Sequence, residues 1–193
     1  MSYDIRYVDV PANESTRDRA EHDSNITELE KIGSGLYGKV YSSDLTPYVV
    51  KVFRGMDIGY MKLLEFRKIL NIHNRFLPRV YDVVFYRHLE EDGSVSEDAN
   101  LHTGVVKMEK LKHRRDYQVW DGKFATLARF LGSKIQHPED YNGFHNPEFE
   151  ETAALIRLVY EETIKEDDTM SYDIHSGNIM LRKGQIVITD PIA

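Results

Sequence analysis

The sequence predicts an α+β protein with two lobes, in which a sheet with one helix precedes a reduced helical part. Short strand-like runs dominate from Ile26 to Lys110, and a single helical pattern interrupts them. Beyond Leu111 the patterns become helical, and a hairpin signal follows near the C-terminus. We therefore expect a first lobe over residues 26–110 and a second, compact lobe over residues 111–193.

The composition allows such a protein and argues against several other classes. Hydrophobic residues make up 41% of the 193 residues, which is enough to bury a core. The lack of cysteine excludes a disulfide framework and a thiolate metal site, and no apolar run has the length of a membrane span or a signal-peptide core. The net charge of −7 argues against general binding to nucleic-acid phosphates. We expect a cytoplasmic protein with no membrane partner and no general nucleic-acid binding.

Residues 1–25 differ in character from the rest of the chain. They are polar and mixed in charge, and the stretch from Asn13 to Arg19 shows no apolar period. We predict a polar N-terminal tail here. A docking or regulatory arm is the alternative.

Five strand-like runs account for the predicted first lobe. The first three follow one another closely around a glycine-rich turn, which predicts three antiparallel strands. Asp57 can cap a helix that ends near Asn71, and an acidic loop over residues 90–100 separates the last two runs. The runs are 29–32, 39–42, 48–53, 80–85 and 103–108.

Two helices and a hairpin are expected in the second lobe. Residues 123–135 give one helical pattern, and residues 147–165 give a stronger one with Asn146 as its cap and Pro147 at its first position. One face of the second helix should pack in the core, and the hairpin follows. The face residues are Phe149, Ala153, Ile156 and Tyr160, and the hairpin strands are 179–181 and 185–189.

A glycine-rich loop occupies residues 33–40, with the sequence GSGLYGKV. Glycines let backbone N–H groups approach phosphates closely. A dinucleotide-binding loop opens into a helix, whereas this loop continues into a strand, so the pattern favours the ATP-binding loop of kinases. The residues expected to contact the cofactor are Gly33, Ser34, Gly35, Tyr37, Gly38 and Val40.

Lys51 lies within an apolar strand, where burying a cation is costly unless a partner group offsets the loss of hydration. We predict that it binds the α and β phosphates of ATP. In the following helix Glu65 falls on one face with Ile58, Met61 and Ile69, and a carboxylate there suits pairing with Lys51. The plain alternatives are an outward-pointing strand lysine and a glutamate that extends to solvent.

The strand that ends near Glu109 leads into a connector between the predicted lobes. Backbone groups near Glu109 and Leu111 are expected to bond the adenine edge of ATP, an assignment that depends on their position in the chain.

The strongest signal is the segment 172–180 (YDIHSGNIM), which a hairpin connects to ITDP at 188–191. Phosphoryl transfer needs a carboxylate that accepts or orients the attacking hydroxyl, and oxygen ligands for Mg²⁺. Asp173 suits the first role, and Asn178 and Asp190 suit the second. His175 has two interpretations, a charge near the transferred phosphate or a histidine hydrogen-bonded within the loop. A hydrolytic metal site would leave Lys51 unexplained.

These two segments resemble the early protein kinase of short-tailed lytic bacteriophages of the autographivirus group, and the order of motifs is similar from about Gly33 onward. The resemblance implies a two-lobed protein-kinase-like fold, ATP and Mg²⁺ in the cleft, and phosphorylation of Ser or Thr on host proteins. Phosphorylation of its own chain stays open. The resemblance carries over to Lys51, Asp173, Asn178 and Asp190.

The chain departs from ordinary protein kinases at three places. Ser171 and Tyr172 replace the His-Arg pair before the catalytic aspartate, Pro191 follows Asp190 in place of Phe-Gly, and the sequence stops at Ala193. The activation segment that cradles peptide substrates is therefore not seen. Two other functions stay open, a small-molecule phosphotransferase with an Asp-x-His-x-x-Asn loop and a catalytically weak kinase-like module that inhibits a host protein by binding it.

Overall fold

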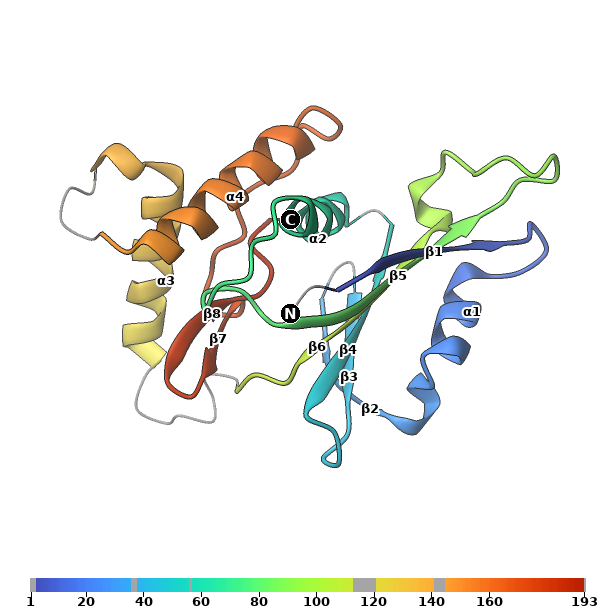
Figure 1. The fold of residues 1–193 in the computed structure, drawn as a ribbon, viewed down its shortest axis with the longest axis horizontal. Coiled ribbons are helices and arrows are strands. Elements are labelled where there is room, and N and C mark those ends of the chain that lie inside the picture. Colours follow the sequence, from blue (N-terminus) through green and yellow to red (C-terminus); the bar gives the residue numbers. More distant parts are fainter. Residues whose placement is uncertain (1–2, 36–37, 56, 113–120, 141–144, 193) are drawn as a thin grey trace. The chain divides into compact units, whose positions relative to one another are not determined.

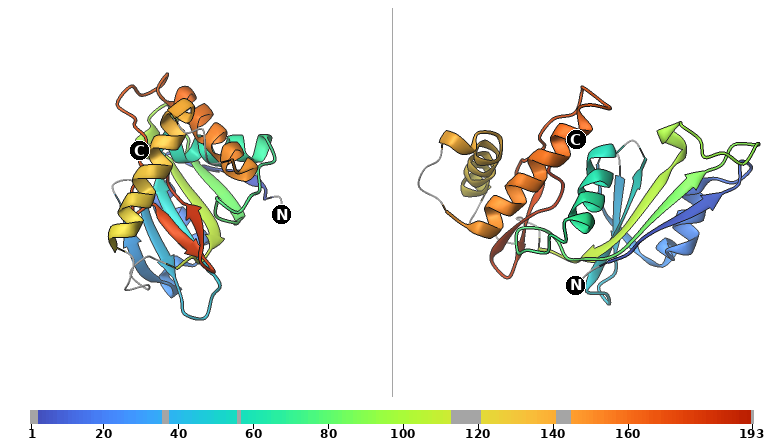
Figure 2. Two further views of the ribbon diagram at one scale, coloured as in Figure 1. Left: turned by 90° about the vertical axis from the view of Figure 1, so that its left-hand side faces the viewer. Right: turned by 45° about the horizontal axis from the view of Figure 1, so that its top comes forward.

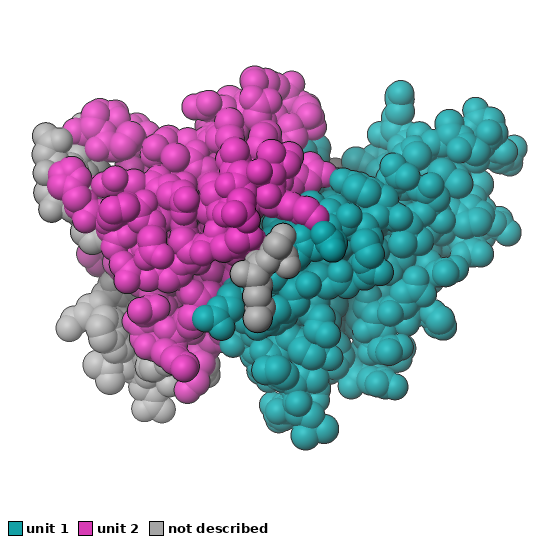
Figure 3. All heavy atoms as spheres, viewed as in Figure 1, with its two compact units in different colours: residues 1–61, 79–110 teal, residues 62–78, 111–193 magenta. Residues whose placement is uncertain are grey.

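The computed structural model describes residues 3–35, 38–55, 57–112, 121–140 and 145–192. Strands dominate the first half and helices the second, so the predicted α+β class is confirmed (Figure 1). The chain divides into two compact units (Figure 3), unit 1 with residues 1–61 and 79–110 and unit 2 with residues 62–78 and 111–193.

The elements follow the predicted order, with two additions at the N-terminus. They are β1 (Ile5–Val10), α1 (Thr16–Asp23), η1 (Ile26–Glu28), β2 (Glu30–Ser34), β3 (Gly38–Ser42), β4 (Tyr48–Arg54), α2 (Ile58–Ile69), β5 (Val80–His88), η2 (Ala99–Leu101), β6 (Thr103–Glu109), α3 (Asp121–Gln136), η4 (Pro138–Asp140), α4 (Pro147–Thr163), β7 (Ile179–Arg182) and β8 (Gln185–Ile188).

Unit 1 is built on a six-stranded sheet of order β1-β5-β6-β4-β3-β2. The strands β2, β3 and β4 pair antiparallel, as predicted, and β6 pairs antiparallel with both β4 and β5. Only β1, among the strands described, pairs parallel, and it forms one edge of the sheet beside β5.

The predicted N-terminal tail is wrong, because residues 5–10 form β1 and residues 16–23 form α1. Each charged side chain of β1 that is exposed finds a partner on β5. Arg6 pairs with Asp82 at 2.6 Å, and Asp9 pairs with Arg87 at 2.7 Å. The mixed polar sequence therefore belongs to an edge strand whose charges are paired across the sheet, a pattern that single-sequence periodicity does not detect.

Helix α1 packs on one face of the sheet, as the right view of Figure 2 also shows. It has no apolar stripe, and it buries only Thr16 and Ala20. Ala20 is fully buried in a cluster of side chains from the helix, the segment after it and the sheet. The cluster contains Val10, Ala20, Ile26, Val50, Val52, Val84, Tyr86 and Val105.

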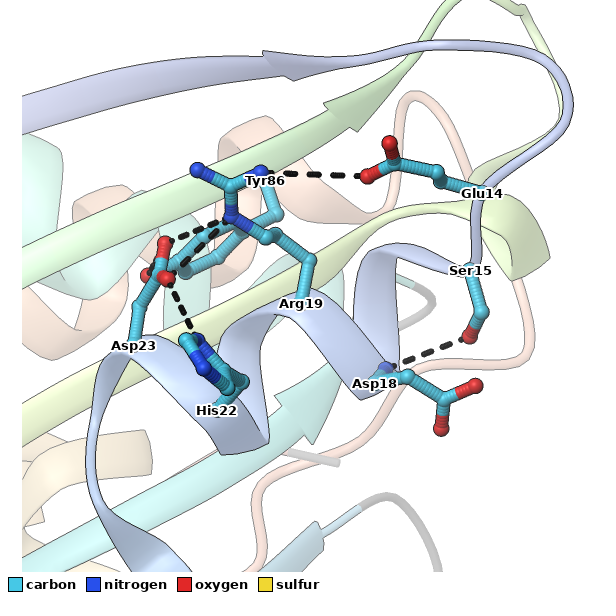
Figure 4. Close-up of polar contacts among 7 residues, drawn as sticks. All are labelled: Glu14, Ser15, Asp18, Arg19, His22, Asp23 and Tyr86. Atoms are coloured by element: carbon cyan, nitrogen blue, oxygen red, sulfur yellow. Dashed lines mark hydrogen bonds and ion pairs between the residues drawn. The ribbon is translucent and has the colours of Figure 1, made fainter.

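Polar contacts fix α1 at both ends (Figure 4). Ser15 caps the helix by accepting a hydrogen bond from the Asp18 N–H at 3.2 Å. Near the other end the carboxylate of Asp23 accepts from Arg19 at 3.0 Å and from the Tyr86 hydroxyl of β5 at 3.4 Å. Burial and the nearby Asp23 raise the pKa of Tyr86 to about 12, so the neutral phenol persists as a donor to the carboxylate.

Replacing Ala20 by Gln should lower the free energy of unfolding by about 3 kcal/mol, because a larger polar side chain must enter the closed cluster. Urea unfolding measures this cost. His22→Gln changes an exposed residue of the same helix and should change stability by less than about 0.5 kcal/mol. Equal stability of the two variants would mean that α1 does not dock on the sheet.

Unit 2 contains α3, α4, the β7–β8 hairpin and residues 62–78. Asn146 caps α4 as predicted, since its Oδ1 accepts from the Phe149 N–H at 3.2 Å. Phe149 is buried and packs edge-on against Phe76 with 5.4 Å between ring centroids. The backbone N–H of Ile188 donates to the Phe76 carbonyl at 2.8 Å, which fastens the hairpin to the same segment.

Among the described residues, none of the helices has the length and apolarity needed to cross a membrane.

Candidate active site

The register of the sheet places Lys51 opposite Val40 on β3 and opposite Val106 on β6. Paired residues project from the same face, so Lys51 and Val40 lie on one face of unit 1. Val52, the next residue of β4, belongs to the cluster under α1. Lys51 therefore lies on the face that α1 does not cover, and it is only 7% exposed.

Two side chains close to Lys51 explain how a buried ammonium group is tolerated in unit 1. Its Nζ donates to Asp57 Oδ2 at 3.3 Å, and it lies 3.5 Å from the centre of the Tyr60 ring. Tyr60 in turn packs edge-on against Phe53, with ring centroids 5.2 Å apart. An opposite charge and an aromatic face both stabilise the charged form of lysine.

Asp57 has two functions in this arrangement, and the sequence revealed one of them. Its Oδ1 accepts from the Tyr60 N–H at 3.2 Å, which is the predicted cap of α2. Its Oδ2 binds Lys51, which the sequence analysis did not foresee. An aspartate at a helix start six residues after a strand lysine was the available signal.

The face argument that led to Glu65 needs correction. Ile69, expected on the apolar face of α2, is 75% exposed. The buried positions of the helix are instead Tyr60, Leu63, Leu64 and Arg67, on the opposite side. Glu65 is half-buried, and its pairing with Lys51 stays a prediction.

Substitution of Asp57 separates its two contacts. Asp57→Ala removes both the cap and a buried ion-pair partner, so the free energy of unfolding should fall by about 3 kcal/mol in urea titrations. Asp57→Asn keeps a cap acceptor and should cost less. The exposed Asp168→Ala serves as the control. If Asn costs as much as Ala, the cap adds nothing and the account of Asp57 is wrong.

The glycine-rich loop joins β2 to β3 in unit 1. The Gly35 N–H donates to the Gly38 carbonyl at 2.8 Å, which closes the turn. A Cβ at Gly38 would lie 3.0 Å from the Val52 carbonyl oxygen and 3.4 Å from the Lys51 Cε. Glycine therefore lets this strand pass close to Lys51. The predicted contact residue Tyr37 lies outside the described residues, and the roles of Gly33, Ser34 and Gly35 stay predictions.

Glu109 ends β6, and its backbone N–H and carboxylate both bond the backbone of Arg79, each at 2.9 Å. Glu109 belongs to unit 1, and Leu111 belongs to unit 2. The predicted contacts of both residues with adenine stay predictions.

The second group of predicted residues comes together within unit 2. Backbone bonds fasten the segment of Asp173 and Asn178 to the segment that follows β8. Asp173 N–H donates to the Pro191 carbonyl at 2.8 Å, and Thr189 N–H donates to the Asn178 carbonyl at 2.9 Å. These bonds hold the loop of Asp173 and Asn178 beside the chain on either side of Asp190.

The side chains of Asp173 and Asn178 are bonded to each other. Asn178 Nδ2 donates to the Asp173 carbonyl at 2.9 Å and to its Oδ2 at 2.7 Å. Because the amide nitrogen of Asn178 donates both of its hydrogen bonds to Asp173, the amide oxygen points away from these acceptors and can accept from, or coordinate, another group. Asp190 has a buried carboxylate oxygen. An amide oxygen and a carboxylate are the hard ligands that Mg²⁺ prefers, so the donor set of Asn178 and Asp190 fits this metal.

The described residues contain no group of three His, Cys, Asp or Glu side chains placed to hold an ion. A kinase-type metal site needs fewer protein ligands, since Mg²⁺ takes further ligands from phosphates and water.

His175 is hydrogen-bonded within the loop, as one of its two interpretations expects. Its Nδ1 accepts from the Gly177 N–H at 2.9 Å, which places the ring proton of neutral histidine on Nε2. That nitrogen lies 3.4 Å from Asp173 Oδ1. A Cβ at Gly177 would lie 2.5 Å from the His175 ring, so a larger residue there would displace the ring from this position. A part for His175 in phosphate transfer stays a prediction.

The sequence analysis did not identify three contacts that position this loop. The Tyr172 ring stacks on Tyr160 of α4, with centroids 4.1 Å apart, and Tyr172 pairs with Ile192 in a β-bridge. Burial, then the neighbouring Tyr160, raises the pKa of Tyr172. Gly132 of α3 lies against Ile174, where an added Cβ would meet the Ile174 Cβ at 3.6 Å. The aromatic pair thus supports Asp173 from the position where ordinary protein kinases carry arginine.

Comparisons with known proteins give matches only among solved structures, since no protein-family model and no curated protein matches the chain. The chain is similar to a MAP kinase from Leishmania major, with 17% identity and a TM-score of 0.39, over 91% of this chain and 50% of that chain. It is also similar to the streptomycin–ATP–APH(2″)-IIa ternary complex, with 15% identity and a TM-score of 0.36, over 94% of this chain and 72% of that chain. The chain thus spans about half the length of the MAP kinase. Because both TM-scores are low, the proposed function rests on the residues of the site.

Proposed function

We propose that this protein is an ATP-dependent protein kinase that phosphorylates Ser or Thr hydroxyls. The observation that carries the proposal is the joined arrangement of Asp173 and Asn178, bonded to each other and tied by backbone to the chain around Asp190. A carboxylate beside two oxygen ligands for Mg²⁺ is the minimal set that phosphoryl transfer requires.

Asp173 orients the acceptor hydroxyl and takes its proton as the hydroxyl attacks. Its Oδ2 accepts from Asn178 and its Oδ1 faces His175 Nε2, so the carboxylate is held in one orientation. A carboxylate held in this way needs little reorganisation during the reaction.

Asn178 and Asp190 would hold Mg²⁺, and Mg²⁺ supplies neutralisation of the phosphate charge when bound. Thr189 contributes to their placement, because its N–H and its Oγ1 both donate to the Asn178 carbonyl, at 2.9 and 3.1 Å. The β7–β8 hairpin connects Asn178 to Asp190 along the chain, so both ligands adjoin a regular element.

Lys51 and the glycine-rich loop would bind the phosphates of ATP from unit 1. Asp57 and Tyr60 contact the Lys51 ammonium group in its buried position. Lys51 is buried, has a carboxylate partner, and lies opposite the strand that follows the glycine turn. Packing alone does not require a lysine at this position, whereas phosphate binding explains it.

Residues 172–180 and 188–191 resemble the early phage kinase. On this resemblance we propose that the acceptor is a protein, that the chain is of phage origin, that its substrates are host proteins, and that it acts in the cytoplasm. The Asp-x-His-x-x-Asn spacing is shared with small-molecule phosphotransferases, so that function is the main rival.

Incubation of the purified protein with γ-labelled ATP, Mg²⁺ and a bacterial lysate tests the acceptor. We expect label on protein bands, at Ser or Thr after acid hydrolysis, and none of it with Asp173→Asn. Label confined to small molecules would favour the rival phosphotransferase. ATP binding without any transfer of label would favour a kinase-like module that acts by binding a host protein.

A further inference from the structure

A cationic hollow lies in unit 1, beside the glycine-rich loop. It has a volume of about 160 Å³ and is open to solvent, which gives several times the space that one water molecule needs. Three cationic side chains line it, namely Arg17 of α1, Lys39 of β3 and Arg54 of β4. None of the described residues that line it is acidic.

The sheet register puts two cationic residues of this hollow on the face opposite Lys51. Lys39 pairs with Val52, and Arg54 pairs with Thr103. Val52 is part of the cluster under α1, and alternate residues of a strand project from one face. Lys39 and Arg54 therefore lie on the α1 side, whereas Lys51 projects from the other side.

Two of the three positive charges have no ion-pair partner among the described residues, and the third is paired. Arg17 Nε donates to Glu21 at 2.9 Å, which engages one of the five N–H donors of the guanidinium. For the side chains of Lys39 and Arg54, the described part of the chain offers no ion-pair partner. Like charges around one cavity repel each other, and a bound anion removes that repulsion.

The hydroxyl of Thr103, which also lines the hollow, is already committed. Thr16 Oγ1 donates to the Leu101 carbonyl at 2.6 Å, so the hydroxyl proton of Thr103 is the one shared between the two threonine oxygens, 3.0 Å apart. The available donors are therefore the cations. Two guanidinium groups and an ammonium group converging on one space suit the tetrahedral oxygens of a phosphate.

We propose that this hollow binds a dianionic phosphate group, either the free ion or the phosphate of a small phosphomonoester. A bound phosphate connects α1 to β3 and β4. Because Gly35 and Gly38 also line the hollow, it would at the same time brace the base of the glycine-rich loop. The proposal does not depend on kinase activity.

Calorimetric titration of the full chain in phosphate-free buffer tests the site, with inorganic phosphate as one probe and AMP as the other. Arg54→Gln and Lys39→Gln should each weaken phosphate binding by about 10-fold or more, since each removes a charged hydrogen-bond donor. Lys31→Gln removes the same charge from exposed β2, outside the hollow, and should leave binding within about twofold. Phosphate should also raise the melting temperature of the wild type and of Lys31→Gln.

Lys51→Gln distinguishes this site from the predicted ATP site. Phosphate binding kept in Lys51→Gln and lost in Arg54→Gln supports the proposal, and the reverse pattern overturns it. No phosphate or AMP binding by the wild type also overturns it. Urea unfolding without ligand verifies that each variant is folded, and Lys39→Gln carries the test if Arg54→Gln is not. Tighter binding of AMP than of phosphate identifies a phosphomonoester as the ligand, and equal binding identifies the free ion.

Discussion

Replacing Asp173 with Asn should reduce the rate of γ-phosphate transfer by about 10²–10⁴-fold, the contribution typical of a positioned general base. In the wild type, Asn178 Nδ2 donates to Asp173 Oδ2 at 2.7 Å. The variant keeps the size of the side chain and an oxygen that can accept the same hydrogen bond. The loop should therefore keep its structure, and the loss should appear in kcat with little change in the KM for ATP.

Rate measurements with γ-labelled ATP, together with urea unfolding of each variant, check this prediction. Asp168→Asn is the matched control, because Asp168 is exposed and lies five residues before Asp173 in the same unit. The control should retain the wild-type rate. A transfer rate for Asp173→Asn within a few-fold of the wild type would rule out Asp173 as the catalytic carboxylate.

Replacing Asp190 with Asn should have a comparable effect through the metal. The substitution removes a negative charge from a carboxylate with one buried oxygen, and the contribution of Mg²⁺ to transition-state stabilisation amounts to several kcal/mol. We expect kcat/KM to fall by about 10²-fold or more at fixed Mg²⁺.

A titration of transfer rate against Mg²⁺ concentration identifies the cause. Excess Mg²⁺ should restore part of the activity of Asp190→Asn and none of the activity of Asp173→Asn, because only the first variant is defective in metal binding. Chelation of Mg²⁺ should abolish transfer by the wild type. An Mg²⁺ dependence for Asp190→Asn equal to that of the wild type would contradict the metal-binding role.

The strands and α-helices from β2 onward could be predicted because local signals determine them, whereas the short helices η2 and η4 were not predicted. The glycine turn between β2 and β3, the cap at Asn146 and the turn between β7 and β8 each act within a few residues. The same is true of the Asp173-to-Asn178 spacing, since both side chains lie on one short loop that bonds to itself.

The features that were missed depend on residues far apart in the sequence. β1 is held by ion pairs with β5, and α1 docks through Ala20 on a sheet formed later in the chain. The orientation of α2 is another case. Its sequence has apolar residues on two faces, and the folded protein buries the face with Leu64 and exposes Ile69. The contact between Lys51 and Asp57 needed both the strand register and the helix start.

The most direct test of the proposed function is the Mg²⁺-dependent transfer of the γ-phosphate from labelled ATP by the purified protein, counted separately on protein, on small molecules and in water. The account predicts transfer that requires Mg²⁺, is lost in Asp173→Asn and persists in Asp168→Asn. ATP binding without loss of the γ-phosphate to any acceptor, with bacterial lysate supplied, would contradict it.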